Sequence, residues 1–372
     1  MSVKLSRRAA LMLPLAIALP GRARAQGMTI TDAIGRTITL KGAAERVVLG
    51  FNFEEFTAVA GAEGWNKVVG FSRRQWAVNR QAVYARYLAA VPPLANVADV
   101  GAAEDNSFSV EKTLSLRPDL LVIDKWGFST LTPIMTQLQE AGVPVLVADY
   151  QAQNPASHVA GTLALGAAMG TMDRARELAA LYANRVSDVR RRARAAGTSP
   201  KIYFEIGMGG ADVIGNTYNN AIWGALLELV GGINIAKGKI QSGWGPMAPE
   251  FVLAAAPDFV FITGSSWANS PNAVRTGYDT DLATARRTLA PYAKRPGWET
   301  LPAIRNGELH TIEAGLARCL MDFVAMQYIA KQLFPAQSSD LDPVAELRAY
   351  HAKYLPVAFT GTWMARLTDS AA

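Results

Sequence analysis

Cysteine and histidine are scarce in this chain of 372 residues: Cys319 stands alone beside His158, His310 and His351. A lone cysteine cannot form an internal disulfide or supply a cysteine-based zinc site. The histidines lie far apart in the sequence, so each is interpreted as a structural residue and no shared metal site is predicted. The sequence therefore predicts no resident cofactor and no metal ion bound by protein ligands alone.

Long hydrophobic runs are scarce as well. The apolar run from Ala9 to Leu19 is too short to span a bilayer, and Pro14 and Pro20 interrupt it. Basic residues precede this run, and a small-x-small sequence, Ala23-Arg24-Ala25, follows it. That order is typical of a cleaved signal peptide, so residues 1–25 are predicted to direct export to the periplasm.

The leader also resembles the twin-arginine export motif at Ser6-Arg7-Arg8-Ala9-Ala10-Leu11, where Ala10 replaces the usual bulkier residue. Ordinary secretion is the alternative route. Cys319 lies far from the position after the cleavage site that a lipid-anchoring cysteine would occupy, so the mature protein is expected to be soluble.

Basic charge is largely confined to the leader. The chain has a net charge of +6, but residues 1–25 contain five basic side chains and no acid. The remainder has 32 basic side chains (37 minus 5) against 31 acidic ones. This near balance does not predict a nucleic-acid partner.

Common enzyme motifs are missing too. The glycine-rich turn from Gly207 to Gly210 lacks the third glycine of a dinucleotide fingerprint and the lysine of a P-loop. Glu54 and Glu55 are candidates for a paired-carboxylate site, but adjacent helical residues point in different directions, so both are not expected to face one substrate. The sequence favours a protein that is not an enzyme, with a periplasmic enzyme as the alternative class.

What the chain does contain is an internal repeat. Residues 109–123 read SVEKTLSLRPDLLVI and residues 248–262 read APEFVLAAAPDFVFI, with Glu111 matching Glu250 and Asp119 matching Asp258 at a constant offset of 139 residues (250 minus 111). Each copy predicts a short helix, a Pro-Asp turn and a strand buried on both faces. Two similar α/β lobes with a cleft between them are expected.

The remaining pattern sets the expected boundaries. Apolar runs predict strands at 47–49, 67–70, 120–123, 143–148, 201–206, 259–263 and 309–312, and helices at 54–60, 132–141 and 321–333. A proline-free stretch from Ala156 to about Ala196 predicts one long helix, and 335–342 a loop. The expected organisation is a signal peptide 1–25, an N-terminal lobe 26–153, a connecting helix 154–197, a C-terminal lobe 198–334 and a C-terminal extension 335–372.

Several features together resemble one family. They are a hairpin followed by Arg46-Val47-Val48, two Glu-x-x-Leu-x-x-x-Pro-Asp segments, the long mid-chain helix and the run PGWETLPAIRNG at 296–307. Over most of residues 28–334 they resemble the periplasmic binding proteins of iron-complex ABC importers, which include haem, cobalamin and molybdate binders. The resemblance implies an α/β fold of two lobes with mainly parallel sheets, joined by a single long helix, with ligand in the cleft between the lobes. Residues 268–295 and the tail after Pro335 exceed the family's usual minimum.

Ligands of open α/β sheets bind beyond the carboxyl ends of the strands, and the loops there are aromatic and basic in this sequence. The candidate ligand-binding residues are Arg73, Arg74, Trp76, Trp126, Tyr218, Trp244, Trp267 and Arg318. The alternative to ligand binding is that each tryptophan is a half-buried packing residue and each arginine a solvated surface charge. A metal chelate, in particular a ferric siderophore, is the predicted ligand. Within the family the alternatives are haem held by Tyr84 or Tyr87, cobalamin, and molybdate or tungstate.

Glu111 and Glu250 are the candidate partner-binding residues. The resemblance implies exposed glutamates, one on each lobe, that dock onto basic residues of two permease subunits at the inner membrane. A carboxylate in the first turn of a helix is also favoured by the helix dipole, so capping is the alternative. A monomer is expected.

Overall fold

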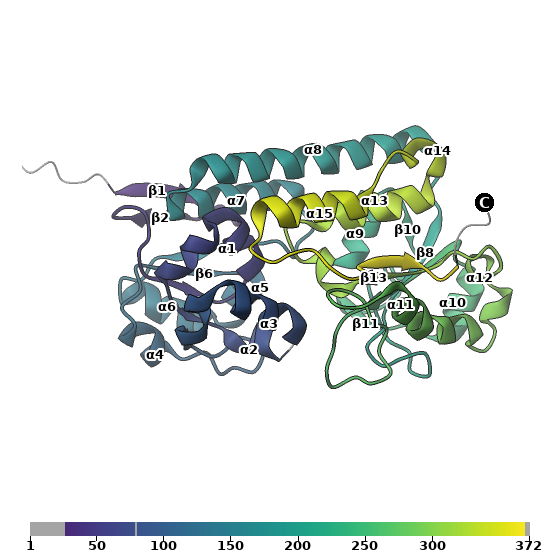
Figure 1. The fold of residues 1–372 in the computed structure, drawn as a ribbon, viewed down its shortest axis with the longest axis horizontal. Coiled ribbons are helices and arrows are strands. Elements are labelled where there is room, and N and C mark those ends of the chain that lie inside the picture. Colours follow the sequence, from purple (N-terminus) through teal and green to yellow (C-terminus); the bar gives the residue numbers. More distant parts are fainter. Residues whose placement is uncertain (1–26, 79, 369–372) are drawn as a thin grey trace, which may run out of the picture.

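The computed structural model describes residues 27–78 and 80–368. The predicted signal peptide lies outside the described residues. Two lobes stand side by side, and one long helix runs above both of them (Figure 1). No helix in the described part of the chain is both long and apolar enough to cross a membrane.

The N-terminal lobe is built on a five-stranded parallel sheet. In spatial order its strands are β5 (Ala98–Asp99), β4 (Val68–Phe71), β3 (Val47–Leu49), β6 (Leu120–Ile123) and β7 (Val145–Val147). The central strands are apolar and buried on both faces, as a parallel sheet covered by helices requires. The predicted strand positions in this lobe are confirmed to within one or two residues.

Helices and a hairpin cover this sheet. They are β1 (Met28–Thr31), β2 (Thr37–Leu40), α1 (Phe53–Ala60), α2 (Arg73–Ala77), α3 (Gln81–Ala90), α4 (Val110–Ser115), α5 (Lys125–Thr130) and α6 (Thr132–Glu140).

The C-terminal lobe repeats the plan. Its sheet has the order β10 (Ile233–Asn234), β8 (Lys201–Ile206), β12 (Phe259–Gly264), β13 (Leu309–Glu313) and β14 (Met364–Arg366). All pairs are parallel except β13 with β14. The other elements are β9 (Asn216–Tyr218), β11 (Trp244–Pro246), α9 (Trp223–Leu229), α10 (Pro249–Ala255), α11 (Leu282–Leu289), α12 (Pro302–Arg305) and α13 (Asp322–Leu333).

The repeated Pro-Asp sequence has one structural role in both lobes. The backbone N–H of Arg46 donates to Asp119 Oδ1 at 2.9 Å, and the N–H of Lys201 donates to Asp258 Oδ2 at 2.8 Å. In return, the N–H of each aspartate donates to the carbonyl of the same partner, at 2.9 Å in both lobes. Each aspartate therefore ties the start of its strand, β6 or β12, to the neighbouring strand β3 or β8.

The helical connection consists of two helices instead of the single helix expected from Ala156 onward. α7 (Pro155–Met169) ends at Gly170, whose φ of 73° is the left-handed geometry of a helix C-terminus, and α8 (Met172–Ala196) begins two residues later. α7 packs on the N-terminal lobe. α8 has 25 residues, about 38 Å of helix, and continues to α13 of the C-terminal lobe.

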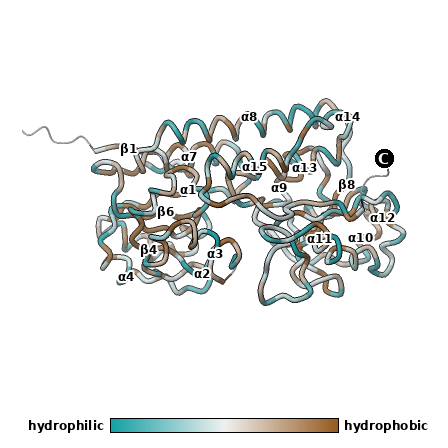
Figure 2. Tube along the Cα trace, in the orientation of Figure 1, coloured by the Kyte–Doolittle hydropathy of each residue, from teal (hydrophilic) through white to brown (hydrophobic). Residues whose placement is uncertain are grey.

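One hydrophobic core joins the lobes beneath α8. It extends from Leu49 of the N-terminal sheet through Tyr182 of α8 to Val324 of α13. The strands that contribute side chains to this core, such as β4 and β6, are coloured brown in Figure 2. This shared core lets the helices hold the two lobes as a stiff pair.

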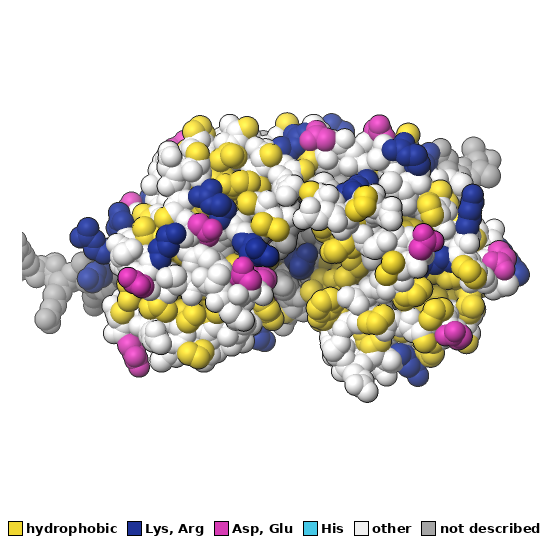
Figure 3. Space-filling model, turned by 90° about the horizontal axis from the view of Figure 1, so that it is seen from below, with side chains coloured by type: hydrophobic (Ala, Val, Ile, Leu, Met, Phe, Trp, Pro, Cys, Tyr) yellow, Lys and Arg dark blue, Asp and Glu magenta, His cyan; other side chains and the backbone are white. Residues whose placement is uncertain are grey.

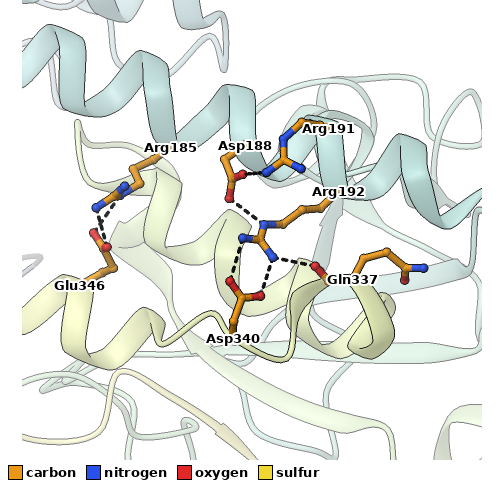
Figure 4. Close-up of polar contacts among 7 residues, drawn as sticks. All are labelled: Arg185, Asp188, Arg191, Arg192, Gln337, Asp340 and Glu346. Atoms are coloured by element: carbon orange, nitrogen blue, oxygen red, sulfur yellow. Dashed lines mark hydrogen bonds and ion pairs between the residues drawn. The ribbon is translucent and has the colours of Figure 1, made fainter.

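The C-terminal extension touches both lobes. The loop expected at 335–342 contains a short helix, α14 (Pro335–Ser338), and α15 (Pro343–Tyr354) then packs against α13 and α1 before β14 joins the sheet. Arg192 of α8 pairs with Asp340 and donates to the Gln337 carbonyl at 2.6 Å, so α8 anchors the extension (Figure 4).

Candidate functional site

A cavity of about 190 Å³ lies between the lobes, at the carboxyl ends of strands from both sheets. In the space-filling view from below, hydrophobic side chains gather on the C-terminal lobe beside the hollow between the lobes, and basic and acidic side chains lie on the opposite side of it (Figure 3). The residues lining the cavity are Phe51, Asn52, Phe53, Glu54, Glu55, Trp76, Arg80, Met208, Ser265, Trp267, Glu313, Ala314, Gly315 and Arg318. They follow β3 and β4 in one lobe and β8, β12 and β13 in the other.

Trp76 forms a fixed aromatic wall on the N-terminal side. It is 1% exposed, and its ring lies 4.6 Å from the ring of Phe53 and 4.7 Å from that of Tyr87, measured between centroids. Such packing leaves the indole little freedom to lose on binding.

Trp267 faces the cavity from the C-terminal lobe and is half-buried. The guanidinium of Arg275 donates to the carbonyls of Trp267 and Ser270, each at 2.6 Å. Segment 268–295 therefore returns to hold the loop that carries Trp267.

Charged groups form the floor of the cavity. Arg80 pairs with Glu54 of its own lobe. Glu313 comes from the other lobe and accepts from the Gly315 N–H at 2.6 Å and from the Ser265 hydroxyl at 3.1 Å. Burial lowers the pKa of Arg80, but Glu54 and Glu313 outweigh it and raise that pKa above its usual value.

Gly315 allows the two lobes to meet on this floor. A β-carbon at this position would lie 2.8 Å from Glu313 Oε2 and 2.9 Å from Arg80 Nη2. A side chain at this position would force the ends of Glu313 and Arg80 to move apart.

Glu55 also connects the lobes. Its Oε1 accepts from the backbone N–H of Leu320 at 3.1 Å. Burial, with the neighbouring Glu54 as the second cause, raises the pKa of Glu55 to about 8. Glu55 is therefore mostly protonated at neutral pH.

The structure places both Glu54 and Glu55 in the cavity lining, so the expectation that adjacent helical carboxylates cannot face one site was wrong. Their position explains the error. They lie in the first turn of α1, beside Asn52 at the helix start, where the cavity wraps around the end of the helix.

Trp76, Trp267 and Arg318 are the predicted ligand-binding residues that line the cavity. The structure places Arg73 and Arg74 outside the lining. The guanidinium of Arg73 donates to the Tyr84 hydroxyl at 2.8 Å and to the Val97 carbonyl at 2.6 Å, so it holds the N-terminal lobe together. Arg74 pairs with an exposed neighbour, Asp105, at 3.1 Å.

The other three candidates also lie outside the lining. Trp126 is 48% exposed and Trp244 is 57% exposed. Tyr218 is buried and faces Trp244 across the β9–β11 pair. Burial raises the pKa of Tyr218, and the charge of Arg318 opposes that rise, so Tyr218 lies within the field of this arginine.

The histidines occupy three different parts of the interior. His310 Nε2 lies 2.9 Å from Glu308 Oε2, and His351 Nε2 lies 2.8 Å from the Tyr278 hydroxyl. His158 is buried beside Asp322, with 3.6 Å between Nδ1 and Oδ2. Within residues 27–78 and 80–368, no group of three His, Cys, Asp or Glu side chains is arranged to hold a metal ion.

The tyrosines considered as haem ligands are engaged elsewhere. Tyr84 accepts from Arg73, and Tyr87 is fully buried against Trp76. Neither lines the cavity.

Glu111 and Glu250 are both exposed, in the first turns of α4 and α10. The N-terminal cap of α4 is made by Ser109, whose hydroxyl accepts from the Lys112 N–H at 3.1 Å. Glu111 is therefore not the residue that caps its helix.

Comparison with known proteins identifies the fold. Residues 59–315 match the periplasmic binding protein family. The chain belongs to this family. It is similar in structure to the TroA-like periplasmic binding protein FepB from Veillonella parvula, with 32% sequence identity and a TM-score of 0.87 over 91% of this chain and 99% of that one.

Two further proteins are similar to this chain. The ABC transporter substrate-binding lipoprotein YvrC of Bacillus subtilis is 22% identical over 290 residues, which are 78% of this chain and 79% of YvrC. The molybdate-binding protein MolA of Haemophilus influenzae shares the fold, with a TM-score of 0.66 and 17% identity over 90% of this chain and 99% of its own. Binding proteins of this family deliver ligands to ABC permeases, so the cavity is the candidate ligand site of a substrate-binding protein.

Proposed function

We propose that this periplasmic binding protein captures an intact metal chelate, in particular a ferric siderophore, and delivers it to the permease of an ABC importer. The observation that carries the proposal is the cavity between the lobes, lined by Phe51, Phe53, Trp76 and Trp267 with Arg318 beside them. Aromatic faces supply apolar contact area at little entropic cost, and a guanidinium pairs with hydroxamate or carboxylate oxygens.

The size of the cavity bears on how the ligand is held. A volume of about 190 Å³ is below the range of pockets that enclose a whole drug-sized molecule. We propose that part of the chelate enters the cavity while the rest stays at the rim between the lobes.

Titration monitored by tryptophan fluorescence tests the proposal. A ferric trihydroxamate should quench the emission saturably, and Trp267→Ala should weaken its binding. Trp244→Ala is the matched control, because Trp244 is exposed and lies outside the cavity lining, and its affinity should be unchanged. Tight binding of bare ferric ion with no response to any chelate would refute the proposal.

For export, the proposal includes cleavage of the leader at residue 25 and the twin-arginine route. Replacing Arg7 and Arg8 by lysine should block export. Unchanged export of this variant would assign the ordinary secretory route.

A further inference from the structure

The charges around the cavity carry an inference about the ligand that rests on the proposed function. Two arginines, Arg80 and Arg318, line the cavity together with Glu54, Glu55 and Glu313. The lining therefore holds three carboxyl side chains and two guanidinium groups, so basic side chains are not in excess there.

Arg80 is already committed to the protein. It forms an ion pair with Glu54, and its guanidinium and the Glu313 carboxylate converge over Gly315. An anionic ligand that replaced Glu54 on Arg80 would leave that carboxylate, which is only 4% exposed, buried and unpaired. Arg80 Nε has no hydrogen-bond partner among the described residues, so this single N–H is the part of Arg80 left for a ligand oxygen.

Two acceptor atoms on the cavity wall lack donors. Glu54 Oε1 and Asn52 Oδ1 are buried without a hydrogen-bond partner among the described residues. Both residues line the cavity. A buried acceptor without a donor is costly, so a ligand that brings N–H groups would satisfy these atoms, whereas an anionic oxygen would repel them.

A carboxyl group outside the lining, that of Glu104, lies within the field of Arg318. Burial raises the pKa of Glu104. The positive charge of Arg318, which is exposed, opposes that rise. Burial raises the pKa of Asp124 to about 7, and the negative charges of Glu104 and Asp149 add to that rise. The positive charge of Arg318 is therefore set against Glu104 on the facing lobe.

Aromatic side chains also line the cavity, and Trp267 and Phe51 are the two of them that are only partly buried. The face of an aromatic ring attracts cations and does not attract anions. We propose that the cavity selects a metal chelate that is neutral or positively charged, and that Glu54 and Glu313 are the residues that discriminate against chelates with net negative charge.

Three ferric chelates test this charge rule. The first is a trihydroxamate with a pendant ammonium group, which is cationic. The second is the same trihydroxamate with that amine acetylated, which is neutral, and the third is a tricatecholate with three negative charges. The cationic and neutral chelates should bind at least about tenfold more tightly than the tricatecholate, and added salt should weaken binding of the cationic one most.

The variants Glu54→Gln and Glu313→Gln should each reduce the ratio of the affinity for the cationic chelate to that for the tricatecholate by about tenfold. Glutamine at 313 can still accept from the Gly315 N–H and bond to the Ser265 hydroxyl, so this variant should fold. Glu63→Gln is the control, because Glu63 is exposed and lies outside the lining, and it should leave this ratio of affinities unchanged.

The outcomes separate the two proposals. If the tricatecholate binds most tightly and both glutamine variants leave the order unchanged, the charge rule is wrong while the chelate-binding function stands. If none of the three chelates binds, the proposed function fails and the charge rule fails with it. The salt dependence decides the matter on the unmodified protein should a variant not fold.

Discussion

Glu55 is a carboxylic acid held between the two lobes, where water cannot stabilise its charged form. Burial raises its pKa from 4.5 to about 8. Between those values the unfolded chain releases this proton while the folded protein retains it. The free energy of unfolding therefore falls as the pH rises through this window, by the amount that Glu55 contributes.

Glu55→Gln should remove this penalty and keep the hydrogen bond from Leu320, because the amide oxygen can accept it. The melting temperature of the variant relative to the unmodified protein should rise from pH 5 to pH 8. Other titrating groups are shared by both proteins and largely cancel in the difference. An equal difference at both pH values would show that Glu55 is ionised in the folded state.

Arg318 and Arg73 were both predicted to bind the ligand, but their surroundings in the structure differ. Arg318→Ala should weaken chelate binding by about one decade, because a charge-assisted hydrogen bond to a ligand oxygen is lost, with little change in melting temperature. Arg73→Ala should instead lower the melting temperature, since its partners Tyr84 and Val97 lie within the N-terminal lobe. Calorimetry and titration on both variants check this, and equal losses of affinity would place Arg73 at the ligand.

At the scale of elements, the C-terminal extension is held to α8 by a small set of ion pairs. Arg192 bonds Asp188, Asp340 and the Gln337 carbonyl, and Arg185 pairs with Glu346 of α15 (Figure 4). The extension lies against Arg192, so this arginine links α8 to the extension.

Arg192→Ala should lower the melting temperature by about 2 to 4 °C, because three partners lose one half-buried donor. Arg191→Ala is the matched control: its side chain is 69% exposed and pairs with Asp188, so its loss should change the melting temperature by less than about 1 °C. Equal effects from both variants would mean that the extension is anchored elsewhere.

Elements with strong local signals were predictable. Val47–Leu49 and Leu120–Ile123 form strands over the predicted residues, because a strand buried on both faces needs a continuous apolar run. The division at Gly170 was missed because its neighbours on both sides are good helix formers, and one glycine inside such a pattern is weak evidence for an end.

The site was less predictable than the fold. Aromatic residues just after strands were a usable signal for Trp76 and Trp267. Arg80 and Glu313 are 233 residues apart (313 minus 80) and meet only because the lobes face each other over Gly315, which no local pattern encodes. The polar pair Glu54-Glu55, at the start of a helix that follows a strand, is a local signal for two further lining residues.

For the whole molecule, the two lobes are held together by contacts on several levels. Besides the core beneath α8, Arg86 of the N-terminal lobe pairs with Asp279, with 3.2 Å between Nε and Oδ2, and Gln153 donates to the Ala317 carbonyl. Two lobes held stiffly together keep the distance between their surface residues fixed. This favours a partner that contacts one surface residue on each lobe.

Glu111 and Glu250 are such a pair, exposed at matching positions of the repeat. Replacing both by Ala should leave melting temperature and ligand affinity nearly unchanged but abolish uptake, because surface carboxylates steer association more than they stabilise a fold. Glu63→Ala with Glu299→Ala, exposed glutamates of the same two lobes outside the repeat, is the control. Normal transport by the Glu111 and Glu250 double variant would remove their role in docking.

Native mass spectrometry of the protein purified from the periplasm of its own host, combined with a metal assay, tests the central claim most directly. The account predicts a one-to-one adduct whose mass equals an organic chelator plus one metal ion, released together when the protein is denatured. A bare metal ion bound without an organic partner, or an adduct that contains no metal, would contradict it.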